Sequence, residues 1–260
     1  MKSAKSSRIE RAIANFETHQ IDTLLVTIEE NRRYLSGFTG EDNGFDESAG
    51  ALLISAEGLI LATDSRFTLQ AENEAPGFEV VTYKKGLSKE LPKLLEKLKT
   101  KRLGFEGRRV SCHQFDMMRE QLRENKPDVE LVKIRELVEK LRVQKAPDEI
   151  DAIRAALHLA ENAFIRFLND LQPGMTEIEA AWQMEKYMRE AGAEALSFPV
   201  IAAAGQNAAL PHAIPSQRKI KAGEPLLFDW GARLHGYCSD ISRTVFIGEP
   251  DDRFKTVFEA

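Results

Sequence analysis

The chain has 260 residues, 43% hydrophobic and 30% charged, and this composition excludes an intrinsically disordered protein because it supplies enough apolar surface for a core. At ~100–200 residues per domain, the length corresponds to one large domain or two ordinary ones. The formal net charge of −5 argues against nucleic acid as the main partner, since proteins that bind it usually carry a basic surface. No stretch approaches the ~20 apolar residues of a membrane-spanning helix, so no membrane partner is expected.

The N-terminal residues give the expectation about the cellular compartment. Residues 1–16 are charged, follow a helical pattern and lack the apolar core of a secretory signal peptide. Export is therefore not expected, and the sequence favours a cytoplasmic protein.

The first half of the chain alternates between strand and helix patterns. Patterns typical of strands cover residues 22–27, 51–55, 59–63, 102–106 and 129–132, and patterns typical of helices cover residues 9–16, 88–98 and 113–123. The pair Glu57-Gly58 separates two of the strands and predicts a hairpin. This alternation indicates an α/β domain over residues 1–135, followed by a linker over residues 136–147.

The second domain, residues 148–260, is expected to open with two helices. Pro147 suits the first position of a helix, and an apolar stripe at helical spacing follows over residues 150–168. After a Pro-Gly break, Thr176 and Glu179 form a capping box that predicts the start of a second helix. That helix is expected to run to about residue 191 and to stop at Gly192.

Residues 226–247 hold the pair of acidic residues that is most informative about chemistry. Two strand-like runs flank a Leu-His-Gly turn in this segment. If the hairpin is centred between Leu234 and His235, Asp229 lies directly opposite Asp240, with their Cβ atoms ~4.5–5.5 Å apart. This register is a hypothesis, because a bulge at the turn would shift it.

Two facing carboxylates on apolar strands repel each other and are costly to bury unless a proton, a cationic side chain or a metal ion relieves them. Hard oxygen ligands suit Mn, Co, Zn or Mg, and paired carboxylates are typical of hydrolytic sites with two metal ions. The spacing alone is equally consistent with two aspartates on an exposed sheet face.

A second candidate element precedes this pair. Residues 197–212 (S-F-P-V-I-A-A-A-G-Q-N-A-A-L-P-H) predict an apolar strand and a loop of small residues that ends at His212. A loop that presents one histidine suits contact with a substrate or an oxyanion. By itself, a lone histidine in a loop is more often only a surface residue.

Taken together, these motifs resemble the pita-bread metallopeptidases, in the branch of Xaa-Pro aminopeptidases and prolidases that also includes creatinase. Residues 33–40 (R-Y-L-S-G-F-T-G) and 63–66 (T-D-S-R) resemble the creatinase-like N-terminal domain of that branch. Residues 144–150 (Q-K-A-P-D-E-I) resemble its domain junction. Residues 207–212 (N-A-A-L-P-H) and 229–240 (D-W-G-A-R-L-H-G-Y-C-S-D) resemble its catalytic signatures.

The resemblance implies a fold, a reaction and a set of site residues. The fold is α/β (α+β), a creatinase-like N-terminal domain followed by the first half of a pita-bread catalytic domain. Asp229 and Asp240 are expected to bind metal, and His212 is expected to be catalytic through contact with the substrate. Two divalent ions (Mn, Co or Zn) activate a water in this family. The expected substrates are peptides with proline at the second position, and the expected assembly is a homodimer.

The sequence departs from the family in one respect. The family uses a histidine and two glutamates from later strands as further metal ligands, and no segment here matches those motifs. We therefore expect that the chain ends within the catalytic domain and that this segment alone is inactive or weakly active. Two alternatives stay open: a creatinase-like amidinohydrolase, and a catalytically silent binding module of the same fold. The three site residues count against the silent module, and the missing ligands count for it.

Overall fold

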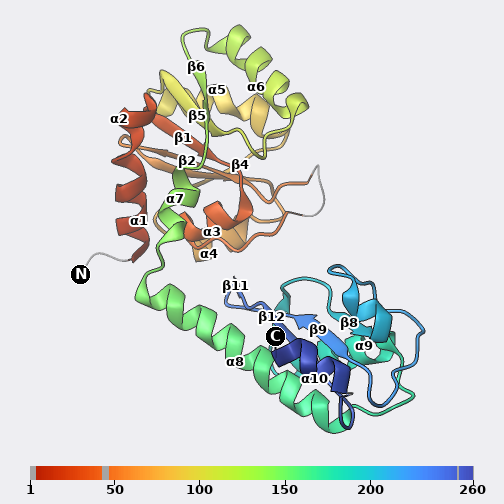
Figure 1. The fold of residues 1–260 in the computed structure, drawn as a ribbon. Helices are drawn as coiled ribbons and strands as arrows, with labels where there is room; N and C mark the ends of the chain where they lie inside the picture. The colour runs from red at the N-terminus through yellow and green to blue at the C-terminus, as the bar shows by residue number, and fades with distance from the viewer. Residues whose placement is uncertain (1–3, 43–46, 251, 260) are drawn as a thin grey trace. The chain divides into compact units, whose positions relative to one another are not determined.

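The computed structural model describes residues 4–42, 47–250 and 252–259. The chain forms two compact units, residues 1–144 and residues 145–260 (Figure 1). Each unit mixes helices and strands around its own hydrophobic core, as the sequence predicts.

A six-stranded sheet organises the first unit. Its strands are β1 (Thr23–Val26), β2 (Ala51–Ser55), β3 (Leu59–Thr63), β4 (Glu79–Thr82), β5 (Arg102–Glu106) and β6 (Glu130–Ile134). They lie in the order β4-β3-β2-β1-β5-β6. All neighbouring strands run parallel except β2, which is antiparallel to both β1 and β3.

Helices cover both faces of this sheet. They are α1 (Ala4–Ile13), α2 (Phe16–His19), α3 (Glu29–Ser36), α4 (Thr68–Glu74), α5 (Leu87–Lys97), α6 (Cys112–Asn125) and α7 (Leu137–Val143). Because side chains alternate along a strand, Leu24 and Val26 pack on the face that α1, α3 and α7 cover. Leu25 packs on the opposite face with α5 and α6 (Figure 1). Burial on both faces explains why the strands β1, β2 and β3 are mostly apolar.

Several predicted elements of the first unit are confirmed, and others were not foreseen. The hairpin around Glu57-Gly58 joins β2 to β3, and β5 has the bounds that its pattern predicts. No sequence pattern predicted α3, α4 or β4. Within the stretch expected to be a linker, Leu137–Val143 form α7, whose apolar side chains are buried in the core of the first unit.

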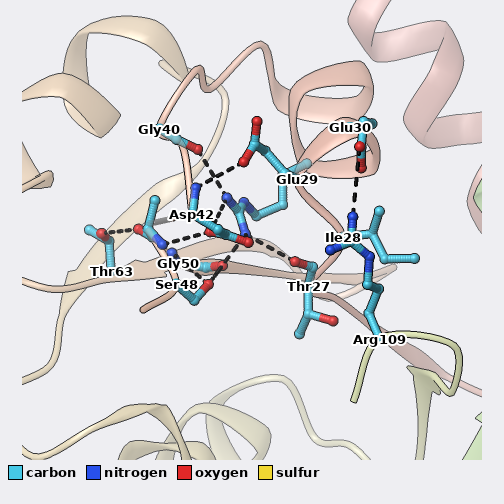
Figure 2. Close-up of polar contacts among 12 residues, drawn as sticks. Thr27, Ile28, Glu29, Glu30, Gly40, Asp42, Ser48, Gly50, Thr63 and Arg109 are labelled. Carbon is cyan, nitrogen blue, oxygen red and sulfur yellow. Dashed lines mark hydrogen bonds and ion pairs between the residues drawn. The ribbon is translucent and has the colours of Figure 1, made fainter. Parts of the chain in front are cut away.

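A fully buried guanidinium lies beside the carboxyl end of β1. Arg32 of α3 is 0% exposed and donates two hydrogen bonds to Asp42, at 2.7 and 3.1 Å. It also donates to the carbonyl oxygens of Thr27 and Gly40, at 2.9 and 3.0 Å. Asp42 in turn accepts a bond from the backbone N–H of Ala49 (2.8 Å). This network, shown in Figure 2, ties α3 to the segments around residues 40–42 and 48–50.

The second unit starts with the two helices that the sequence predicts, α8 (Pro147–Asp170) and α9 (Glu177–Glu190). The capping box at Thr176 is confirmed, and Gly192 just beyond α9 has a φ of 102°. The remaining elements are β7 (Ala195–Leu196), β8 (Ile201–Ala204), the 3₁₀ helix η1 (Gly205–Ala209), β9 (Leu226–Trp230), β10 (Ala232–Leu234), β11 (Tyr237–Cys238), β12 (Ile241–Val245) and α10 (Asp252–Glu259). Two three-stranded sheets result, ordered β11-β10-β7 and β12-β9-β8.

Aromatic side chains join α8 to β9 in the core of the second unit. Phe164 stacks on Trp230 with ring centroids 4.2 Å apart, and Phe167 meets Phe228 edge-on at 5.3 Å. The indole N–H of Trp230 donates to the carbonyl oxygen of Ala160 (3.0 Å), so the buried ring leaves no polar atom unsatisfied. These contacts hold β9 firmly against α8.

The predicted register of the hairpin after β9 is wrong by two residues. Asp229 lies opposite Ser242, and Ile241, the residue after Asp240, pairs with Trp230. The cause is the turn, whose two central residues are His235 and Gly236, with φ values of 51° and 73°. A two-residue hairpin turn with positive φ at both positions matches the twist of its strands. Asp240 therefore does not face Asp229 as a cross-strand partner.

Candidate metal and catalytic site

Asp229 lies on the middle strand of its sheet. It pairs with Ile201 of β8 on one side and with Ser242 of β12 on the other. Its neighbours Phe228 and Trp230 point into the core at 1% exposure each. Since side chains alternate along a strand, the Asp229 carboxylate is on the opposite face of the sheet.

The Asp229 carboxylate is only partly satisfied. Its Oδ1 atom is buried and has no hydrogen-bond partner among the described residues. Burial raises the pKa of Asp229, and the negative charge of Asp240 adds to this rise. A hydrogen bond from the Ser242 side chain and the nearby imidazole of His212 act in the opposite direction. A buried carboxylate oxygen without a donor is costly, and a bound cation would offset that cost.

The other two predicted site residues are exposed, and both influence the Asp229 carboxylate. Asp240 lies between β11 and β12, and His212 lies in the loop after η1. Each acts on Asp229 through its charge, so the structure brings the three side chains into one electrostatic neighbourhood. Their grouping comes from the sheet and the loop together rather than from cross-strand pairing of the aspartates.

A glycine allows the close approach of chain segments beside Asp240. A Cβ atom at Gly231 would lie 1.9 Å from the carbonyl oxygen of Ser239, so no larger residue fits there. Ser239 is buried, and its hydroxyl accepts a hydrogen bond from the N–H of Ala232 (3.0 Å). The small residues of the 229–240 motif therefore serve to place Asp240 close to the end of β9.

The loop that carries His212 is anchored by a residue that sequence reasoning missed. Glu177, the first residue of α9, is 1% exposed and accepts hydrogen bonds from the N–H of Ala204 (2.8 Å) and the side chain of Asn207 (3.0 Å). It also accepts from the N–H and the hydroxyl of Ser216, at 3.0 and 2.6 Å. One carboxylate thus binds both ends of the loop.

Burial opposes the charge of Glu177, but the hydrogen bonds from Ser216, Ala204 and Asn207 outweigh it and lower its pKa. The sequence signal was the capping box, in which Glu179 explains the helix start and leaves Glu177 without a role. The sequence signal was therefore a second glutamate in the first turn of the helix, beside the glutamate that already completes the capping box.

The carboxylates at this site fit one side of a divalent cation. Asp229 and Asp240 offer hard oxygen ligands for a metal ion. The Oδ1 atom of Asp229 is free to bind a cation, because it accepts no hydrogen bond from the described residues. Within residues 4–42, 47–250 and 252–259, no group of three or more His, Cys, Asp or Glu side chains has the arrangement of a metal site. The described residues thus supply two candidate ligands and a neighbouring histidine.

Comparison with known proteins assigns both units. Residues 8–144 match the creatinase/prolidase N-terminal domain, and residues 151–260 match metallopeptidase family M24. The chain belongs to metallopeptidase family M24. The expected fold class is therefore confirmed: a mixed α/β chain with a creatinase/prolidase N-terminal domain followed by an M24 domain.

Three relatives of this M24 chain illustrate the match. It is 37% identical to the uncharacterized peptidase YqhT of Bacillus subtilis over 92% of its own length and 65% of the relative's. The solved Xaa-Pro dipeptidase from Bacillus anthracis has a TM-score of 0.89 and 36% identity, covering 98% of this chain and 68% of that one. The X-Pro aminopeptidase from Thermotoga maritima has a TM-score of 0.83 and 36% identity, covering 97% and 68%.

The M24 chain therefore spans about two thirds of the length of these relatives. No helix in the part of the chain that the structure describes is both long enough and apolar enough to cross a membrane.

Proposed function

We propose that this protein is a metal-dependent peptidase acting on peptides with proline at the second position, as an Xaa-Pro aminopeptidase or an Xaa-Pro dipeptidase. The observation that supports this most is the buried, unpartnered Oδ1 of Asp229 beside Asp240 and His212, in a chain of the M24 family. Both a dipeptidase and an aminopeptidase for such substrates occur among its structural relatives.

In this proposal Asp229 and Asp240 hold divalent metal, with two ions of Mn, Co or Zn in the active enzyme. The bound ions supply an activated water for attack on the scissile carbonyl. His212 contacts the substrate and stabilises the negative charge that develops on its carbonyl oxygen. The Ser242 hydroxyl orients the Asp229 carboxylate through its hydrogen bond.

The first domain, residues 1–135, serves dimerisation and the selection of substrates by size in this proposal, and the homodimer works in the cytoplasm. Residues 136–147, of which Leu137–Val143 form α7 in the core of the first unit, lead from it to the catalytic domain, residues 148–260.

Titration of the intact enzyme with Mn²⁺, followed by calorimetry, tests the metal ligands. We expect Asp229→Asn and Asp240→Asn each to abolish binding, whereas Asp151→Asn leaves it unchanged. Asp151 is a matched control because it lies on α8 in the same unit and pairs only with Arg154 at the surface. Absence of Mn²⁺ binding by the unchanged protein would overturn the metal assignment.

Assays of peptides with proline at the second position, against creatine, test the reaction with added Mn²⁺ or Co²⁺. In the intact enzyme, Asp240→Ala should abolish turnover, and His212→Ala should lower kcat more than it weakens Mn²⁺ binding. An unchanged kcat for His212→Ala would show that its assigned role is wrong. Turnover of creatine alone would favour an amidinohydrolase.

A further inference from the structure

The first unit contains a cavity of about 550 Å³ at the carboxyl ends of its parallel strands. The segments that follow β1, β3, β4 and β5 each contribute a lining residue: Thr27, Asp64, Tyr83 and Arg109. Open α/β sheets bind ligands at this edge, and small-molecule sites have volumes of ~300–1,000 Å³. Both the position and the size of the cavity are therefore those of a ligand site.

The cavity has an apolar part. Four apolar residues line it: Leu25 of β1, Leu87 at the start of α5, Val110 just before α6, and Met118 within α6. Such a surface suits the apolar side chain of a ligand, because contact with it removes apolar area from water. The residues are rigidly placed, since Leu25 and Met118 belong to the core between the sheet and its covering helices.

One side of the cavity has an excess of negative charge. Beyond β3, the Arg66 guanidinium lies between two carboxylates, 2.8 Å from Asp64 and 3.1 Å from Glu47. All three side chains line the cavity, and two carboxylates with one guanidinium leave a net charge of −1 there. This side can accept a ligand ammonium group, because carboxylate oxygens keep free lone pairs after one ion pair has formed.

The other side carries a guanidinium with unused donors. Arg109 follows β5, and its nearest carboxylate oxygen, from Glu30, is 3.8 Å away, too far for a hydrogen bond (Figure 2). The hydrogen bonds among the described residues include none from its guanidinium. An arginine with free donors at the edge of a cavity suits a carboxylate, which it can bind through two parallel hydrogen bonds.

The two charged sides are separated by a distance that a small ligand can bridge. Strands β3 and β5 have β2 and β1 between them, so their backbones are about 14 Å apart. A dipeptide spans ~7 Å, and the long side chain of Arg109 covers the rest. Tyr83, which follows β4 next to β3, also lines the cavity and offers a hydroxyl; burial followed by the charge of Asp64 raises its pKa, so it stays protonated as a donor.

We propose that this cavity binds a small zwitterion with an apolar side chain, either a free amino acid or a dipeptide. Its carboxylate pairs with Arg109, its ammonium group lies beside Asp64 and Glu47, and its side chain contacts the surface formed by Leu25, Leu87, Val110 and Met118. The site is in the first unit and does not depend on the peptidase activity proposed for the second.

Calorimetry on the 260-residue protein at low ionic strength tests this site with four probes. L-leucine and L-leucyl-L-leucine carry both charges, N-acetyl-L-leucine lacks the ammonium group, and L-leucinamide lacks the carboxylate. We expect at least one of the two zwitterions to bind, and each blocked analogue to bind at least ~10-fold more weakly than that zwitterion or not at all. The two zwitterions distinguish an amino-acid site from a dipeptide site.

Arg109→Gln should weaken binding of the zwitterion ~10-fold. Arg119→Gln is the matched control, since Arg119 lies on α6, pairs with Asp116 at 2.8 Å and does not line the cavity. Circular dichroism checks that both variants fold. If Arg109→Gln does not fold, Tyr83→Phe provides the test, because it removes only the hydroxyl and should also weaken binding.

Three results would overturn the proposal. The first is that neither zwitterion binds to the unchanged protein. The second is that the blocked analogues bind as well as the zwitterion that binds, which would leave only an apolar cavity. The third is that binding survives Arg109→Gln and is lost in Asp229→Asn, which would place the ligand in the second unit.

Discussion

The buried charges of the two units differ in how they are satisfied. In the first unit, Arg32 is fully buried, and Asp42 and two carbonyl oxygens accept hydrogen bonds from it. In the second unit, Asp229 has a buried oxygen, Oδ1, that accepts no hydrogen bond from any described residue. Arg32 thus has an oppositely charged partner, although its Nε atom is also buried without a hydrogen-bond partner among the described residues, whereas Asp229 lies near the like charge of Asp240.

This difference separates a structural role from a functional one. A buried ion pair with several further hydrogen bonds stabilises one arrangement of the chain around it, here the junction of α3 with residues 40–42 and 48–50. A carboxylate with one buried oxygen that accepts no hydrogen bond is held in place by the rest of the fold. Such a residue is a candidate for ligand binding, and Asp229 has this character.

The largest effect should come from breaking the satisfied pair. Arg32→Met leaves the Asp42 carboxylate without its partner, and we expect the free energy of unfolding to fall by about 3–5 kcal/mol. Urea unfolding followed by circular dichroism measures it. Lys97→Gln is the control, because Lys97 pairs with Glu79 at the surface and its loss should cost less than about 1 kcal/mol. Equal costs for the two variants would show that the buried Arg32–Asp42 pair stabilises the first unit no more than a surface ion pair does.

A second buried carboxylate of the first unit should make stability depend on pH. Glu106 accepts hydrogen bonds from the N–H groups of Thr27 and Ile28 and from Asn31, but burial raises its pKa to about 7, and the charge of Glu139 adds to the rise. Because the folded state holds the proton more tightly, this contribution to stability is complete below pH 4.5 and is lost as the pH rises through 7.

Compared with Glu106→Gln, the unchanged protein should lose about 3 kcal/mol of unfolding free energy between pH 4.5 and pH 7. Urea unfolding at several pH values in this range measures the difference. Arg142 and Glu139 also act on this cluster through Asn31, so both stay unchanged in the comparison. A stability difference that does not vary with pH would show that Glu106 is already ionised throughout the range.

A smaller effect is expected at the loop of His212. Glu177→Gln replaces an acceptor by an amide and should cost about 2 kcal/mol, with faster hydrogen exchange at the N–H groups of Ala204 and Ser216. Glu179→Gln is the control on the same helical turn, since glutamine also completes a capping box. Unchanged exchange in Glu177→Gln would show that the carboxylate does not hold the loop.

The smallest effect should have the opposite sign. Asp229→Asn removes a buried charge and its repulsion by Asp240, so without divalent cations the unfolding free energy should rise by about 1 kcal/mol. With saturating Mn²⁺ the unchanged protein should become the more stable one, because only it binds the ion. Thermal unfolding with EDTA and with Mn²⁺ measures both. A loss of stability in EDTA would mean that Asp229 is a structural residue like Arg32.

Sequence patterns predicted the local elements well where a single segment contains the signal. The β2–β3 hairpin, the start of α8 at Pro147 and the capping box at Thr176 all depend on neighbouring residues, and all are confirmed. The resemblance of the motifs to the M24 family is likewise confirmed. By contrast, α3 is rich in charged side chains, and its burial depends on packing against distant segments, so no local pattern predicted it.

The sequence by itself determined which residues to examine, namely Asp229, Asp240 and His212, and the two-part fold that contains them. Only the tertiary structure decided how they are related. The turn at His235 and Gly236 set the strand register, and positive φ at a non-glycine residue is not visible in a pattern of polarity. The role of Glu177 depends on hydrogen bonds to residues 27 to 39 positions away. Contacts between positions so far apart in the chain form only when the whole unit folds.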